Sequence, residues 1–144
     1  MRIHKITERD FSEWVQLGLE FWSKHTKKEI QEEFNRILNS KKEESFIYRD
    51  HDGYPLGFVA VSIRSDYVEG STFSSKKKPV GYLETIYEKK GYRKKGIARQ
   101  LIKEAEKWFR KQKILEVGSD VEVHNSISQK FHQKMGFKKG ETLI

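Results

Sequence analysis

The sequence predicts a single α/β domain in which the strands of one sheet alternate with amphipathic helices. Segments with a period of two between apolar residues are separated by segments in which apolar residues recur at helical spacing. A length of 144 residues is enough for one hydrophobic core, and no proline- or glycine-rich linker divides the chain. We therefore expect one domain that spans residues 1–144.

The amino-terminal part is predicted to hold a short strand and two helices. Residues 2–6 alternate as a strand, and Thr7 with Asp10 forms a variant capping box for a helix that continues to Trp22. Residues 29–38 form a second amphipathic helix. Trp22 has two interpretations, because an aromatic residue at helical spacing can belong to the core or can line a substrate cleft.

The middle of the chain is predicted to form a hairpin, a long loop and a further strand. Residues 45–49 and 56–64 read as strands around a turn marked by Asp52-Gly53 and Pro55. The segment 65–79 is long for a hairpin loop, and loops of such length are often functional.

The strand at residues 80–87 is expected to alternate regularly and to carry one unusual residue. One face would hold Leu83, Thr85 and Tyr87, and the other Tyr82, Glu84 and Ile86. Glu84 is unusual because a carboxylate in the middle of a strand either reaches a pocket or faces solvent at an edge.

A glycine-bearing basic loop and a long amphipathic helix follow this strand. Apolar residues from Ile97 to Phe109 lie on one predicted helix face. Gly96 and Ala98 are small residues at the helix start, where backbone N–H groups have no helical partner and suit an anion. A phosphate site and a plain solvated basic loop both fit these residues, and neither the Walker A nor the dinucleotide fingerprint does.

The carboxy-terminal part is predicted to hold a strand, a helix and a last strand. Residues 114–121 form the first strand, which contains Gly118-Ser119-Asp120. A helix led by Asn125 follows, and residues 138–144 form the final strand.

Two motifs in this order resemble the GNAT superfamily of N-acetyltransferases. Residues 93–98 resemble its Arg/Gln-x-x-Gly-x-Gly/Ala signature, and residues 125–137 resemble its second motif, an Asn-led helix that ends in Gly-Phe. The resemblance implies the GNAT fold, a single mixed, mostly antiparallel twisted sheet flanked by helices on both faces, and acetyl-CoA as the cosubstrate. The cofactor-binding residues that it implies are Ile86, Tyr87, Arg93, Lys94, Lys95, Gly96, Ile97, Ala98 and Asn125.

Within the superfamily the chain is most similar to the aminoglycoside 6′-N-acetyltransferases, which inactivate antibiotics such as kanamycin and tobramycin. The Arg-x-Asp-Tyr-Val-x-Gly element at residues 64–70 carries most of this similarity. It implies acetyl transfer to a 6′-amine by direct attack through a tetrahedral intermediate, and it implies a homodimer. A polyamine or a protein amino group remains an alternative acceptor. The substrate-binding residues that it implies are Trp22, Tyr67, Glu84, Asp120 and Glu141.

The expected chemistry needs a neutral amine, although a primary amine is largely protonated at neutral pH. A carboxylate that holds the ammonium and accepts its proton serves this need, and we assign that role to Asp120 with Glu84 orienting the amine. The alternative is that both carboxylates only bind the cation. His132 stands where the superfamily has a tyrosine acid, and a general acid and a helix-packing residue are both open for it.

The composition and the absence of certain motifs argue against other classes of protein. The net charge of +8 would suit a nucleic-acid binder, but no recognition-helix or RNA-sheet motif accompanies the basic runs at residues 76–78 and 89–95. The absence of cysteine excludes disulfides and thiolate metal sites, and we expect no metal. No apolar run approaches a membrane span and the amino terminus lacks a signal-peptide pattern, so we expect a cytoplasmic enzyme.

Overall fold

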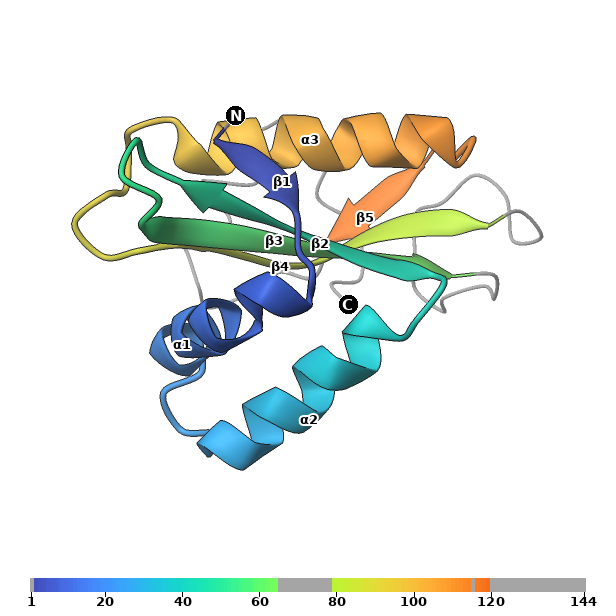
Figure 1. The fold of residues 1–144 in the computed structure, drawn as a ribbon. Coiled ribbons are helices and arrows are strands. Elements are labelled where there is room, and N and C mark those ends of the chain that lie inside the picture. Colours follow the sequence, from blue (N-terminus) through green and yellow to red (C-terminus); the bar gives the residue numbers. More distant parts are fainter. Residues whose placement is uncertain (1, 65–78, 115, 120–144) are drawn as a thin grey trace.

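The computed structural model describes residues 2–64, 79–114 and 116–119, which form a five-stranded sheet with helices on both faces (Figure 1). The strand order is β1-β2-β3-β4-β5, with β1 to β4 antiparallel and β5 parallel to β4. The strands are β1 Ile3–Lys5, β2 Glu43–Arg49, β3 Pro55–Arg64, β4 Val80–Glu88 and β5 Val117–Ser119. The predicted mixed, mostly antiparallel sheet is therefore confirmed.

The helices divide between the two faces as predicted. The helices α1 (Phe11–Phe21) and α2 (Lys27–Leu38) cover one face, and α3 (Ile97–Lys111) covers the other (Figure 1). A short 3-10 turn, η1 (Glu8–Asp10), leads into α1. The second helix begins before the predicted residue 29 because Thr26 and Glu29 form a capping box, in which each side chain accepts the other's backbone N–H.

Each sheet face has its own hydrophobic core. On the α3 side, Leu101 and Phe109 pack against Val59 and Leu83. On the α1 and α2 side, Trp14 stacks on Phe34 at a ring distance of 3.9 Å, and Phe58 and Tyr87 join them from the sheet. Because β3 is buried on both faces, its continuous apolar run fits a central strand.

The last described strand starts later than predicted. Ile114 is buried in the α3-side core, and its N–H donates to the Phe109 carbonyl at 2.9 Å. It therefore belongs to the turn that ends α3, and strand pairing starts only at Val117. The predicted second-motif helix and the predicted final strand lie outside the described residues.

A buried carboxylate joins β1, β2 and the start of α1. Asp10 is 5% exposed, and it accepts hydrogen bonds from the Thr7 N–H at 2.9 Å and from Arg49 Nη2 at 2.8 Å. His4 Nε2 lies 3.0 Å from the same carboxylate. Burial by itself raises the pKa of Asp10, but the bonds from Thr7, Arg49 and His4 outweigh it and lower the pKa to about 2.

We expect Asp10→Asn to cost about 2 kcal/mol of the free energy of unfolding at pH 7. The lowered pKa of Asp10 means that its stabilisation is fully present above its usual pKa of 3.8 and is lost as pH falls through about 2. Urea unfolding of both proteins from pH 7 to pH 2 measures this, and the difference between them should shrink over the acidic end. A difference that stays constant with pH would show that the Asp10 charge is not the source.

Candidate active site

A β-bulge in β4 determines where Glu84 lies. Ala60 pairs with Thr85, but the next residue of β3, Val61, pairs with Leu83, so Glu84 is an extra residue that no backbone position of β3 stands opposite in the register. The predicted regular alternation is therefore wrong at this point. Leu83 and Ile86 are three positions apart, and both pack on the α3-side core. In a regular strand they would lie on opposite faces, so the bulge is what brings them to the same face.

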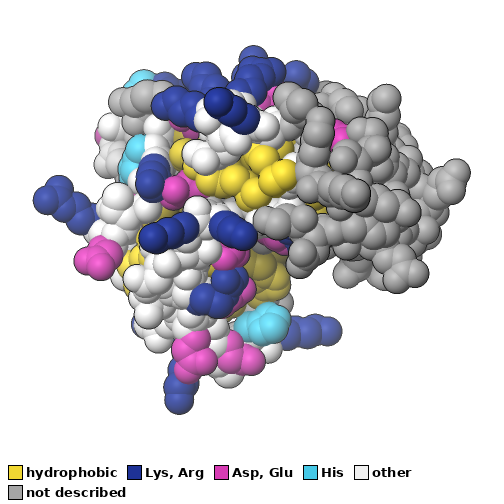
Figure 2. Space-filling view, turned by 90° about the vertical axis from the view of Figure 1, so that its right-hand side faces the viewer, with side chains coloured by type: hydrophobic (Ala, Val, Ile, Leu, Met, Phe, Trp, Pro, Cys, Tyr) yellow, Lys and Arg dark blue, Asp and Glu magenta, His cyan; other side chains and the backbone are white. Residues whose placement is uncertain are grey.

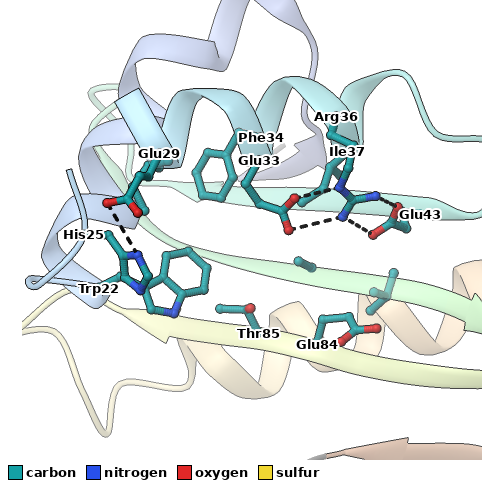
Figure 3. Close-up of a pocket in the computed structure, with 13 residues that line it drawn as sticks. Trp22, His25, Glu29, Glu33, Phe34, Arg36, Ile37, Glu43, Glu84 and Thr85 are labelled. Atoms are coloured by element: carbon teal, nitrogen blue, oxygen red, sulfur yellow. Dashed lines mark hydrogen bonds and ion pairs between the residues drawn. The ribbon is translucent and has the colours of Figure 1, made fainter. Parts of the chain in front are cut away.

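The bulge turns both Glu84 and Thr85 toward a pocket between α2 and the sheet. This pocket has a volume of ≈ 380 Å³, within the range of about 300–1,000 Å³ that is usual for ligand sites. Trp22 and Phe34 line it from the helix side, and Ala60 lines it from β3. Trp22 and Glu84, which the sequence analysis assigned to the acceptor, thus lie on walls of the same pocket (Figure 3).

Carboxylates dominate the ionisable groups of the pocket lining, which are Glu29, Glu33, Glu43, Glu84, Arg36 and His25. Arg36 bridges two of them, with Nε 2.6 Å from Glu33 Oε1 and Nη1 2.6 Å from Glu43 Oε2 (Figure 3). The Arg36 hydrogen bonds lower the pKa of Glu43, so this carboxylate is negative at neutral pH. Backbone and side-chain hydrogen bonds with Thr26 likewise lower the pKa of Glu29.

Glu84 itself has two partners on β3. Ser62 Oγ donates to its Oε2, and Arg64 Nη2 lies 3.1 Å from Oε1 and 3.0 Å from Oε2. The Glu84 side chain keeps 31% of its surface exposed. It can therefore meet a cation in the pocket while it holds these partners.

The two predicted cofactor residues of β4 have different surroundings. Ile86 packs toward α3, and Tyr87 is buried on the α1 and α2 side, where its hydroxyl donates to Glu20 Oε1 at 2.9 Å. Burial and the Glu20 hydrogen bond raise the pKa of Tyr87 to about 12, so its phenol stays protonated at neutral pH. Tyr87 thereby connects β4 to the end of α1.

The backbone N–H groups of Ile86 and Tyr87 also point in opposite directions. The Lys89 N–H donates to the Leu56 carbonyl of β3 at 2.7 Å. Because N–H groups alternate along an antiparallel strand, the N–H of Tyr87 also faces β3, while that of Ile86 faces the opposite edge of β4. This is the edge that pairs with β5 from Gly81 to Leu83.

The basic loop before α3 contains residues with a left-handed backbone conformation. Gly96 is the N-cap of α3 with φ 84°, and Lys94 also has a positive φ of 65°. Arg93, Lys94, Lys95 and Gly96 are exposed, whereas Ile97 and Ala98 are buried at the helix start. A Cβ atom added at Gly96 would meet nothing within 4 Å.

One N–H group at the helix start differs from the sequence expectation. The Ala98 N–H is not uncommitted, because it donates to Glu88 Oε2 at 3.3 Å. This is a long hydrogen bond, and a phosphate at Ala98 would have to displace it. The other predicted site residues, Tyr67, Asp120, Asn125, His132 and Glu141, lie outside the described residues.

The pocket residues on α2 and its flanks were not predicted from the sequence, and they are His25, Glu29, Glu33, Arg36 and Glu43. Glu29, Glu33 and Arg36 gave only the signal of a polar helix face, which is typical of solvated helices as well, and His25 and Glu43 lie outside α2 and gave none. Figure 2 shows Lys and Arg side chains along the top of one molecular face, over the α3 layer, and acidic side chains mixed with them lower down, over α1 and α2. The acidic pocket lies on the opposite sheet face from α3, because α2 and the end of α1 line it.

Within residues 2–64, 79–114 and 116–119, no group of three or more His, Cys, Asp or Glu could hold a metal ion. The same part of the chain contains no helix that is long and apolar enough to cross a membrane.

Comparison with known proteins relates this arrangement to a family. The sequence model of the acetyltransferase (GNAT) family matches residues 2–137. A curated relative from Salmonella enteritidis, an aminoglycoside N(6′)-acetyltransferase type 1, is 34% identical over 144 residues, which cover 100% of this chain and 96% of the relative. A relative of the same name from Acinetobacter haemolyticus is 31% identical, with 100% and 95% covered.

Solved structures agree with these relatives. The structure of AAC(6′)-Iy in complex with a bisubstrate analogue, CoA-S-monomethyl-acetylneamine, has a TM-score of 0.88 and 34% identity, and the match covers 99% of this chain and 93% of that one. The apo structure of the aminoglycoside 6′-N-acetyltransferase AAC(6′)-IG from Acinetobacter haemolyticus has a TM-score of 0.89 and 30% identity, with 100% and 95% covered.

Proposed function

The chain belongs to the acetyltransferase (GNAT) family, and we propose that it transfers the acetyl group of acetyl-CoA to the 6′-amine of aminoglycosides, which confers antibiotic resistance. The observation that carries the proposal is the acidic pocket beside the β4 bulge. Aminoglycosides are polycations, and a pocket lined by four glutamates offers them charge complementarity even in a protein of net charge +8.

The loop that begins α3 is the proposed acetyl-CoA site. The left-handed Gly96 leaves open space at the helix start, and Arg93, Lys94 and Lys95 add positive charge beside it. These features fit a pyrophosphate, with the N–H groups of Ile97 and Ala98 as donors once Glu88 releases Ala98. Asn125 is a further proposed contact.

The proposed chemistry uses groups on β4 and after β5. Acetyl-CoA supplies an activated acyl carbon, and this chain's residues orient the amine and move its proton. Glu84 and Trp22 would hold the amine in the pocket, with Tyr67 and Glu141 as further contacts, and Asp120 would accept the ammonium proton. Because the Tyr87 N–H faces β3, the Ile86 N–H is the proposed donor to the acyl oxygen. His132 is the proposed acid that protonates the leaving thiolate.

A thiol-release assay with acetyl-CoA tests this function. Kanamycin and tobramycin, which carry a free 6′-amine, should support turnover, and an aminoglycoside without that amine should not. Spermine and a lysine peptide test the alternative acceptors. Equal turnover with spermine, or none with either antibiotic, would contradict the proposal.

The cellular setting is part of the same proposal. We place the enzyme in the cytoplasm, where acetyl-CoA is made and used, and we propose that it works as a homodimer. Light scattering of the purified protein measures its mass in solution, and a monomer at micromolar concentration would contradict the dimer.

A further inference from the structure

We propose that Arg64 is a positioning residue for the acceptor amine, because together with Ser62 it fixes the Glu84 carboxylate and leaves one of its acceptor positions for an N–H of the amine. The inference rests on the proposed function of the pocket and adds a residue that acts through Glu84. Its basis is the set of contacts around the extra residue of the β4 bulge.

The contacts occupy most of the acceptor capacity of Glu84. An ionised carboxylate has about four lone-pair sites. Ser62 Oγ and Arg64 Nη2 both reach Oε2, and Arg64 Nη2 also reaches Oε1 at 3.1 Å. Among the contacts that the described residues make, these leave one site, which is on Oε1. One free site suits a single N–H of an ammonium better than the paired N–H groups of a guanidinium.

Arg64 is itself held in place. Its guanidinium carbon lies 3.7 Å from the centre of the Tyr82 ring, and Tyr82 is 1% exposed. A planar guanidinium can stack on a ring and donate sideways at the same time, which a lysine ammonium cannot do. Tyr82 on β4 and Glu84 two residues further on thus contact the same guanidinium of β3, Tyr82 through its ring and Glu84 at the Nη2 atom.

A role in stability alone does not explain this arrangement. The Arg64 and Glu84 side chains are 33% and 31% exposed, so solvent screens the pair in part and limits its contribution to folding. The two interpretations also predict opposite signs for binding. Removing a positive charge beside an acidic pocket should by Coulomb attraction alone tighten the binding of a polycation, whereas loss of a positioning group should weaken it.

A double-mutant cycle with Arg64→Met and Glu84→Gln tests the proposal, read out as kcat/KM and KM for tobramycin and for acetyl-CoA. We expect Arg64→Met to lower kcat/KM for tobramycin about tenfold and to leave KM for acetyl-CoA unchanged. In the Glu84→Gln background the same change should cost less than about twofold, because Arg64 acts through Glu84. Arg64→Lys should recover only part of the loss.

Arg110→Met is the matched control, since it removes the same charge and chemical group from an exposed pair with Glu106 on α3. It should change neither KM. Tighter tobramycin binding in Arg64→Met, equal losses with and without Glu84, or an equal effect of Arg110→Met would each overturn the proposal. If the wild-type protein neither binds nor acetylates tobramycin, the proposed function fails as well, which distinguishes that case from a failure of Arg64 alone.

Discussion

A Gly96→Glu variant is expected to bind acetyl-CoA at least about 100-fold more weakly, because two kinds of cost add up at the start of α3. The new carboxylate would stand at the helix start and compete there for the N–H groups that a pyrophosphate needs. It would also repel the pyrophosphate directly. The protein should still fold, since nothing lies within 4 Å of the new Cβ and the left-handed φ of 84° costs about 1–2 kcal/mol in a residue other than glycine.

Two variants separate charge from backbone strain in this measurement. Gly96→Ala introduces the strain without the carboxylate and should weaken binding far less. Gly53→Glu introduces the same carboxylate at a glycine with φ 86° and equally open surroundings, in the turn between β2 and β3 outside the proposed cofactor loop. Calorimetric titration with acetyl-CoA that finds the same affinity for Gly96→Glu and Gly53→Glu would remove this loop from the site.

The fold was predictable to the extent that local patterns determine it. The helical period of α3, the alternation of β1 and β4 and the apolar run of β3 predicted these elements within a few residues, because burial on one face or on both selects such patterns. Gly96 was singled out as a small residue at the helix start, and the structure shows that it also has a left-handed φ. These features depend on residues that are close in the sequence, so a single sequence is enough to predict them.

The bulge at Glu84 was not predictable in the same way. A bulge is a mismatch in register between two strands, and the sequence of β4 alone reads as regular alternation. The only local sign was a carboxylate in an apolar strand, which indicated a pocket without indicating how it forms. The bulge explains why Glu84 and Thr85, which are adjacent in sequence, both line the pocket.

The acidic wall on α2 depends on contacts between elements. Arg36 bonds to Glu33 within the helix and to Glu43 at the start of β2, and only the helix pair follows from local spacing. The polar face of α2 looks solvated until the packing of α2 over β3 and β4 makes it one side of a pocket. The charge of the chain as a whole, +8, gives no indication of this local reversal.

We expect Asp120→Asn to reduce kcat on the order of 100-fold or more while acetyl-CoA binding is retained. Asp120 lies outside the described residues, and it directly follows Ser119, which pairs with Leu83 beside the bulge residue Glu84. The contacts of Glu84 are the reason for choosing Asp120, and not Glu84, as the proton acceptor. Ser62 and Arg64 already take most of its acceptor sites, which suits a group that orients the amine, so we propose Asp120 as the proton acceptor.

The pH dependence of kcat distinguishes a base from a cation-binding group. An asparagine keeps the size and some of the hydrogen bonding of aspartate but accepts no proton at neutral pH. Above the pKa of the bound amine the substrate arrives neutral, so the Asp120→Asn variant should recover part of its activity as pH rises, whereas Glu84→Gln should chiefly raise KM for tobramycin. If Asp120→Asn raises only KM and leaves kcat and its pH profile unchanged, Asp120 binds the cation, and proton transfer must run through Glu84 or a water.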